Sequence, residues 1–234
     1  MSSTELFNTK EIPIFPLSVV LLPGALLPLH IFEERYKEMI KDCLESDKVF
    51  GLTYSAENET GPPAVGAIGS LAQIMAVVPL DGGRMNILTV GTTRYKTLKY
   101  VGNKVYLKAE VELISDQTDD YDNNALMVEV RKLYDRAADA LKAINDEQTL
   151  PKDLPEAPED FSFAVAAVLQ LSIEKKQMLL ELRSSGLRLN KLRKYLSSII
   201  DDYESRAQIH SRAKRNGHHA SSEALKTLKS EFKD

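Results

Sequence analysis

The stretch IPIFPLSVVLLPGALLPLHIFEERY, residues 12–36, is the most apolar run of the chain. It is longer than the roughly 20 apolar residues that a membrane-spanning helix needs. Prolines interrupt it at Pro13, Pro16, Pro23 and Pro28. Each proline removes a backbone N–H donor, so no continuous helix could satisfy its own hydrogen bonds in lipid. We therefore predict short buried strands over residues 12–15, 19–22 and 25–30, with a turn at Pro23-Gly24.

An amphipathic helix is predicted directly after this run, over residues 33–46, because apolar residues recur there at three- and four-residue spacing. Turn signals and apolar alternation then predict strands over residues 48–54, 65–78, 84–101 and 104–114. Asp81-Gly82 is a hairpin signal, and Gly91 marks a bulge or bend. Residues 11–116 are therefore predicted to form a β-rich domain, a curled sheet or small barrel with one helix.

The pattern changes after a polar and acidic linker at residues 115–122. Apolar residues on one helical face predict a long helix over residues 123–145, and prolines make residues 145–160 an irregular connection. Further helices are predicted over residues 161–171, over residues 173–182 and, after Gly186, to about residue 203. We therefore predict a helical bundle over residues 120–205. For the polar tail, residues 206–234, disorder and a weak helix over residues 222–232 both stay open.

Composition limits the classes of function. Hydrophobic residues make up 43% and charged residues 27% of the 234 residues, as in soluble globular proteins. The formal charge of −4 argues against a general affinity for nucleic acid, which depends on phosphate neutralisation. The single cysteine excludes an intramolecular disulfide, and the first residues lack the basic region of a signal peptide. We expect a cytoplasmic protein that does not enter membranes.

Residues 12–36 and several further segments resemble those of a known family. The further segments are VGAIGSLAQI at 65–74, ILTVGTTRYKTLKY at 87–100 and, within 160–196, DFSFAVAAVLQLSIEKKQMLLEL followed by RLNKLRKYL. They resemble the N-terminal substrate-binding domain of the Lon proteases in its small stand-alone form. The resemblance implies an α+β fold, in which a PUA-like β-pseudobarrel is followed by a C-terminal helical bundle. It also implies the capture of unfolded or partly folded polypeptides.

Full-length Lon proteases continue into ATPase and Ser-Lys peptidase modules, whereas this sequence has no GxxxxGK[ST] phosphate loop. We therefore expect a non-enzymatic polypeptide-binding module with no catalytic residue, cofactor or metal. Its expected partners are exposed apolar segments of unfolded or damaged proteins. A separate protease as a second partner, and the oligomeric state, stay open. The alternative is an RNA-binding PUA-like protein, which the negative charge disfavours.

Methionine offers a soft surface that repacks around varied apolar side chains. The predicted polypeptide-binding residues are therefore Met75, Met85 and Met127, for which buried packing is the competing interpretation. Cys43 is predicted to be a buried structural thiol, and His30 a hydrogen-bonded residue of the core or barrel end. Arg94 is predicted to form a structural ion pair or to lie at a strand edge.

Overall fold

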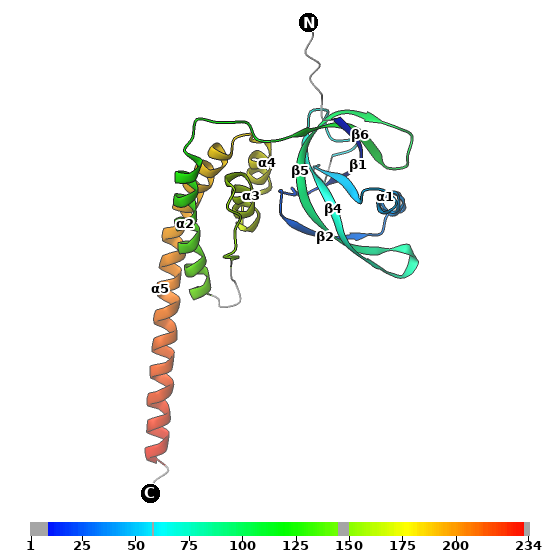
Figure 1. Cartoon of the computed structure of the whole chain (residues 1–234). Helices are drawn as coiled ribbons and strands as arrows, with labels where there is room; N and C mark the ends of the chain where they lie inside the picture. The colour runs from blue at the N-terminus through cyan, green and yellow to red at the C-terminus, as the bar shows by residue number, and fades with distance from the viewer. Residues whose placement is uncertain (1–8, 58, 145–149, 232–234) are drawn as a thin grey trace. The chain divides into compact units, whose positions relative to one another are not determined.

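The computed structural model describes residues 9–57, 59–144 and 150–231, with the backbone alone over residues 213–231. Its strands are β1 (Thr9–Leu17), β2 (Leu26–Ile31), β3 (Val49–Tyr54), β4 (Ile68–Pro79), β5 (Met85–Val101) and β6 (Leu107–Ile114). The helices are α1 (Glu34–Leu44), the short 3-10 turn η1 (Asp81–Gly83), α2 (Asn123–Ile144), α3 (Pro158–Val168), α4 (Ile173–Glu181) and α5 (Ser185–Glu231). Figure 1 shows this order along the chain. The fold is α+β.

The chain divides into two compact units. The first contains Met1–Tyr121 and Pro155–Arg188, and the second contains Asp122–Leu154 and Leu189–Asp234. This division differs from the boundaries expected from the sequence, because α3 and α4 group with the strands. Long-range hydrogen bonds explain the grouping, since the Arg94 side chain on β5 donates to main-chain carbonyls of Leu180 and Leu182. Such contacts leave no periodic signal in the sequence.

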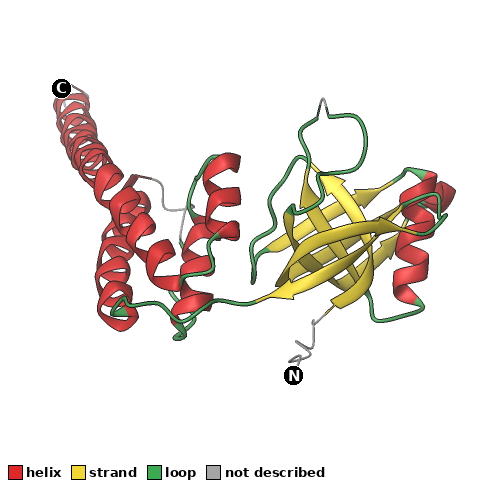
Figure 2. Cartoon of the chain, turned by 90° about the horizontal axis from the view of Figure 1, so that it is seen from above, coloured by secondary structure: helices red, strands yellow, loops and turns green. Residues whose placement is uncertain are grey.

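The strands of the first unit curl into a barrel (Figure 2). β1 pairs in parallel with β3 and antiparallel with β6. β4 pairs with β3 and β5, and β5 pairs in turn with β6, so that β1, β3, β4, β5 and β6 close a ring. β2 pairs with β5 alone among the described strands. β2 is therefore an edge strand, added to the N-terminal half of β5.

The long strand β5 bends at Gly91, as the sequence predicted. Ala72 pairs with Gly91 and Ser70 with Arg94, so β5 has one residue more than β4 between these two pairs. A Cβ at Gly91 would lie 2.3 Å from the carbonyl oxygen of Leu22. Only glycine therefore allows residues 21–22 to cross this closely over β5.

The predicted strand over residues 19–22 is wrong. These residues pair with no strand in the part of the chain that the structure describes, although the side chains of Leu21 and Leu22 are 2% and 1% exposed. Their backbone leads into a turn instead, in which the Ala25 N–H donates to the Leu22 carbonyl at 3.0 Å. The N–H of the preceding residue, Gly24, donates to the Gly91 carbonyl at 2.8 Å. The run is apolar because it packs across β5, so hydrophobicity alone indicated a strand incorrectly.

The predicted first helix is confirmed as α1, which buries its apolar side against the barrel. Tyr36, Met39 and Ile40 are at most 8% exposed and belong to one core cluster with Phe15 and Phe50. The Phe15 and Tyr36 rings stack with centroids 4.0 Å apart. Full burial of a side chain of this size contributes about 1.5–3 kcal/mol to folding. The amphipathic pattern therefore fixed both the helix and the side that it buries.

In the second unit α2 and α5 lie side by side (Figures 1 and 2). Arg136 and Glu204 form an ion pair between them, as do Arg193 and Glu129. α2 matches the helix predicted over residues 123–145. Gly186, expected to separate two helices, lies in the first turn of α5, and residues 206–231 continue this helix rather than starting a separate tail. None of the described helices is long and apolar enough to cross a bilayer.

Candidate functional site

Exposed apolar side chains gather on the outward face of β2, β5 and β4. Strand pairing places Leu88 opposite Pro28, and both side chains point outward. The exposed fractions are 64% for Leu26, 61% for Met75, 56% for Val78 and 36% for Leu88. We call Leu26, Pro28, Met75, Val78 and Leu88 the outer strip. Contiguous exposed apolar side chains of this kind mark interaction sites more often than scattered ones do.

A β-bulge places Met75 on this face. Ile74 pairs with Thr89 and Ala76 with Leu88, so Met75 is the extra residue of β4 between neighbouring positions of β5. A bulge re-aims a side chain and increases the local twist. Both Met75 and Ala76 are therefore exposed, where simple alternation would have buried one of them.

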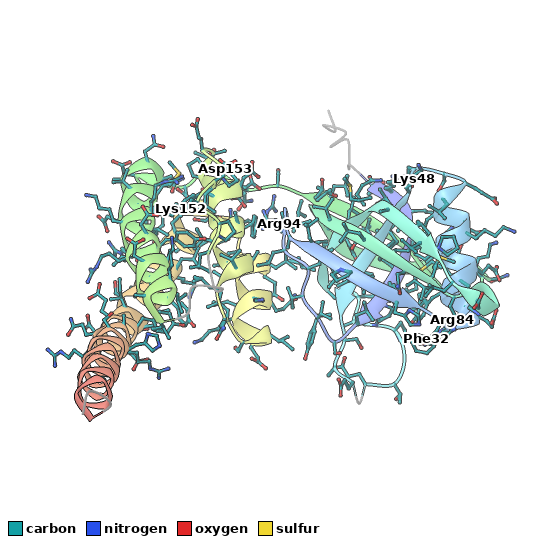
Figure 3. All side chains as sticks on the ribbon, turned by 90° about the horizontal axis from the view of Figure 1, so that it is seen from below. Phe32, Lys48, Arg84, Arg94, Lys152 and Asp153 are labelled. Carbon is teal, nitrogen blue, oxygen red and sulfur yellow. The ribbon has the colours of Figure 1, made fainter. Side chains whose placement is uncertain are left out.

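A polar and aromatic group borders the outer strip. The His30 Nδ1 and Asn86 Oδ1 atoms are 2.7 Å apart, and the His30 ring stacks on Phe32 with centroids 5.8 Å apart. Phe32 is 59% exposed and lies near Arg84 at the end of the barrel farther from Arg94 (Figure 3). His30 is thus hydrogen-bonded as predicted, but it is exposed and not part of the core.

A small apolar groove lies at the start of β2. It has a volume of about 250 Å³. Its walls come from residues 18–22, residues 25–27, Ala167 of α3, and Leu171, Ile173 and Lys176 at the start of α4. Small-molecule pockets usually measure roughly 300–1,000 Å³. This groove is smaller than that range and suits a single apolar side chain better than a cofactor.

Arg94 belongs to a buried polar network and not to an accessible site. It extends from β5 toward α3 and α4 (Figure 3). Its Nη2 lies 2.5 Å from Asp116 Oδ1, and its Nη1 donates to the carbonyls of Leu180 and Leu182 at 3.0 and 2.6 Å. Burial lowers the pKa of the guanidinium, and the Asp116 carboxylate opposes that shift. The predicted structural ion pair is therefore confirmed.

Arg188 completes this network. It binds both carboxylate oxygens of Asp116, and its Nε donates to Ser162 Oγ at 2.8 Å. The guanidinium carbons of Arg188 and Arg94 lie 4.1 and 5.2 Å from the ring centroid of Phe163. Both guanidinium groups thus donate to protein acceptors and lie over one ring, so the network links α3, α4 and β5.

The buried position of Cys43 makes its thiol unreactive. Its side chain is 1% exposed, and Sγ lies 3.4 Å from the Val49 carbonyl oxygen. Burial raises the pKa of the thiol to about 12, whereas nucleophilic cysteines have lowered values. The prediction of a structural thiol is confirmed. Among the described residues, no cluster of three or more His, Cys, Asp and Glu side chains is suited to hold a metal ion.

The sequence model of the substrate-binding domain of ATP-dependent protease La (Lon) matches residues 11–198. The chain belongs to the Lon substrate-binding domain family. Over 194 residues it is 27% identical to the Lon protease of Anaeromyxobacter dehalogenans, a match that covers 77% of this chain and 23% of that protein. The chain therefore spans about a quarter of the length of the curated relatives that it matches.

Solved structures agree with this assignment. The Lon N-terminal domain protein of Xanthomonas campestris is 25% identical, with a TM-score of 0.55 over 78% of this chain and 96% of that one. The N-terminal domain of the Mycobacterium avium complex Lon protease has a TM-score of 0.59 at 20% identity, over 80% and 98% of the two chains. The fold of this chain is thus similar to the folds of these two Lon N-terminal domains.

The structure separates the three methionines predicted to bind polypeptide. Met75 lies on the outer strip. Met85 is half-buried against the core of the barrel and lines a different groove, along α1, together with Leu44 and Val105. Met127 is half-buried on α2, in the other unit.

Sequence reasoning missed Leu26, Val78 and Leu88 as candidates. The apolar run around Leu26 was interpreted as wholly buried. Pro28 was the available signal, because proline within a strand indicates an edge with one side open to solvent.

Proposed function

We propose that this Lon domain binds exposed apolar segments of unfolded or damaged polypeptides through the outer strip. One observation carries the proposal: in a domain of a substrate-binding family, the side chains of Leu26 on β2 and of Met75 and Val78 on β4, the strands on either side of β5, are each more than half exposed. Exposing such a row to water is unfavourable unless a partner covers it.

The chemistry of the strip suits varied partners. Met75 has an unbranched, polarizable side chain that fits many apolar shapes. Leu26, Val78 and Leu88 lie on paired strands, so the backbone beneath them is fixed. A rigid base with one adaptable side chain supports broad recognition of apolar residues rather than of one sequence.

The proposal also covers the type of fold, the cellular location and the protease that receives the bound polypeptides. The barrel is of the PUA-like pseudobarrel type, and the second unit is the core of a helical bundle. The chain acts as a non-enzymatic binding module in the cytoplasm, without a cofactor. Its bound polypeptides pass to a Lon-type protease, in keeping with the names of the relatives.

RNA binding, the alternative raised by the sequence, gains no support. Several lysines of the barrel lie beside carboxylates, which cancels their charge toward a phosphate backbone. The pairs are Lys10 with Asp47, Lys99 with Glu110, Lys104 with Asp42 and Lys108 with Glu11. Binding of nucleic acid depends on unpaired basic side chains.

Fluorescence titration of the full chain tests the proposal. The probe is a reduced and carboxymethylated protein, which stays unfolded, and the control is the same protein with its disulfides intact. We expect saturable binding of the unfolded probe alone, with little change between low and high salt because the contacts are apolar. Equal binding of both forms, or of neither, would exclude the proposed function.

A further inference from the structure

Among the described residues, the edge strand β2 has a strand partner, β5, on one side and none on the other. The Gly91 N–H donates to the Ala25 carbonyl at 2.9 Å, which fixes the alternation of hydrogen bonds along the β2–β5 pair. Leu27, Leu29 and Ile31 consequently direct their backbone groups toward β5. Thr89 Oγ1 also donates to the Leu27 carbonyl on this side, at 2.9 Å.

Leu26, Pro28 and His30 direct their backbone groups the other way. All three residues are exposed, and their backbone groups have no hydrogen-bond partner among the described residues. The free side thus offers N–H donors at Leu26 and His30 and carbonyl acceptors at all three. Proline fits this side of an edge strand, because the N–H that it lacks would have had no partner in the sheet.

We infer that an extended polypeptide segment binds this Lon domain by adding to β2 as a further strand. The inference rests on the proposed function and specifies how the segment is held. Up to five backbone hydrogen bonds are available: two each at Leu26 and His30, and one at the Pro28 carbonyl. Backbone bonds do not depend on side chains, so strand addition gives affinity for segments of many sequences.

Pro28 favours a foreign strand over a second copy of this chain. Antiparallel self-pairing along the whole of β2 would be centred on Pro28, so two Pro28 residues would face each other. Their carbonyl oxygens would then meet with no N–H between them, and a buried acceptor without a donor is unfavourable. A foreign segment with any residue other than proline at that point donates its N–H to the Pro28 carbonyl.

The flanking surfaces specify the side chains of this segment. Side chains of an added strand alternate between the two faces of the sheet. On the outward face they would extend the outer strip beside Leu26 and Pro28. The groove of about 250 Å³ at the start of β2, lined partly by Leu26 and Leu27, has room for one apolar side chain of the added segment. The recognised segment is therefore extended, without proline at the positions that bond to β2, and apolar at alternate positions.

Two backbone-methylated peptides test the inference. The parent is a short fluorescein-labelled peptide of alternating valine and threonine with terminal lysines. One derivative carries N-methyl groups on the valines alone, and the other on the threonines alone. In a strand, the N–H groups of alternate residues point to opposite edges, so the derivatives block different edges and serve as controls for each other.

Titration of the full chain should separate the two derivatives. We expect one derivative to bind as the parent does and the other to bind roughly tenfold more weakly or worse, since it loses several hydrogen bonds. If both derivatives bind with the affinity of the parent, or if both lose affinity equally, the inference of strand addition is wrong. The proposed binding of polypeptides is not contradicted by either result. If neither the parent peptide nor the unfolded protein binds, the proposed function is excluded as well.

Amide hydrogen exchange gives a readout on the protein itself. Bound parent peptide should slow exchange at Leu26 and His30 and leave Leu27 and Leu29, already bonded to β5, unchanged. Pro28→Val adds the missing donor and should tighten binding by roughly two- to tenfold, the contribution of one hydrogen bond. Unchanged exchange at Leu26 and His30 with peptide bound would contradict the inference even if this variant did not fold.

Discussion

Arg188 and Asp116 form a two-pronged ion pair, with Nη1 2.7 Å from Oδ1 and Nη2 2.5 Å from Oδ2. The Arg188 side chain is 1% exposed and that of Asp116 is 11% exposed. Arg94 uses the same carboxylate, so one acidic group balances two buried guanidinium groups, and Glu159 lies 3.7 Å from Arg94 as a second carboxylate. The linker after β6 is thereby fixed to the start of α5.

Asp116→Ala should destabilise the domain strongly. Removing the shared carboxylate leaves two buried cations without their main partner, and breaking a buried pair costs about 3–5 kcal/mol. Urea unfolding measures the effect. Asp120→Ala, in the same acidic linker but exposed, should stay within about 0.5 kcal/mol of the parent. Equal stability of both variants would show that the network contributes nothing.

Gly91→Ala should lower stability by about 1–3 kcal/mol, the usual effect of overpacking. The new Cβ would lie 2.3 Å from the Leu22 carbonyl oxygen, so either β5 or residues 21–22 must move. Thermal unfolding would compare it with Thr93→Ala, an exposed position on the same strand. A stability equal to that of the Thr93 variant would argue against the close crossing.

Tyr106→Phe should raise the pKa of Asp42. The Tyr106 hydroxyl donates to Asp42 Oδ2 at 2.6 Å, and this bond is the largest cause that holds the pKa of Asp42 below its usual 3.8. A lowered folded-state pKa stabilises the fold above the unfolded value of about 4, and that contribution disappears as the pH falls through the folded-state pKa.

The variant should therefore lose about 1 kcal/mol at neutral pH, and less as the pH falls below the folded-state pKa of Asp42. Carboxyl NMR titration measures the pKa, and urea unfolding at several pH values measures the loss of stability. An unchanged Asp42 pKa in the variant would contradict the assigned cause.

Cys43 should resist thiol reagents in the folded protein. The thiol is buried and its pKa is raised to about 12, so almost no thiolate exists at pH 8. Disulfide-exchange labelling should become fast only as urea unfolds the chain, and the unfolded protein is the control. Rapid labelling of the native state would show that the helix α1 opens readily.

Local patterns predicted the elements better than the contacts between them. The spacing of Tyr36, Met39 and Ile40 identified α1 and its buried side, and Gly91 identified the bend in β5. Both signals are confined to a few neighbouring residues. The strand predicted over residues 19–22 failed because a buried irregular segment and a buried strand have the same apolar composition.

Most residues of the outer strip could not be predicted from the sequence. Met75 is exposed because a bulge inserts it between two paired positions, and no residue at that place signals a bulge. The network of Arg94, Asp116 and Arg188 joins positions far apart in the chain. Asp116 was interpreted only as part of a polar linker, since pairing partners at such separation cannot be identified without a fold.

Binding of an unfolded polypeptide by a variant of the outer strip tests the central claim most directly. The variant combines Leu26→Gln, Met75→Gln and Val78→Gln. Its control combines Val65→Gln, Val105→Gln and Val128→Gln, at side chains that are 64%, 62% and 50% exposed elsewhere. We predict that the strip variant binds the carboxymethylated protein at least roughly tenfold more weakly, because loss of central apolar contacts weakens binding by this much. The control variant should bind with unchanged affinity. Equal binding by both variants would contradict the account.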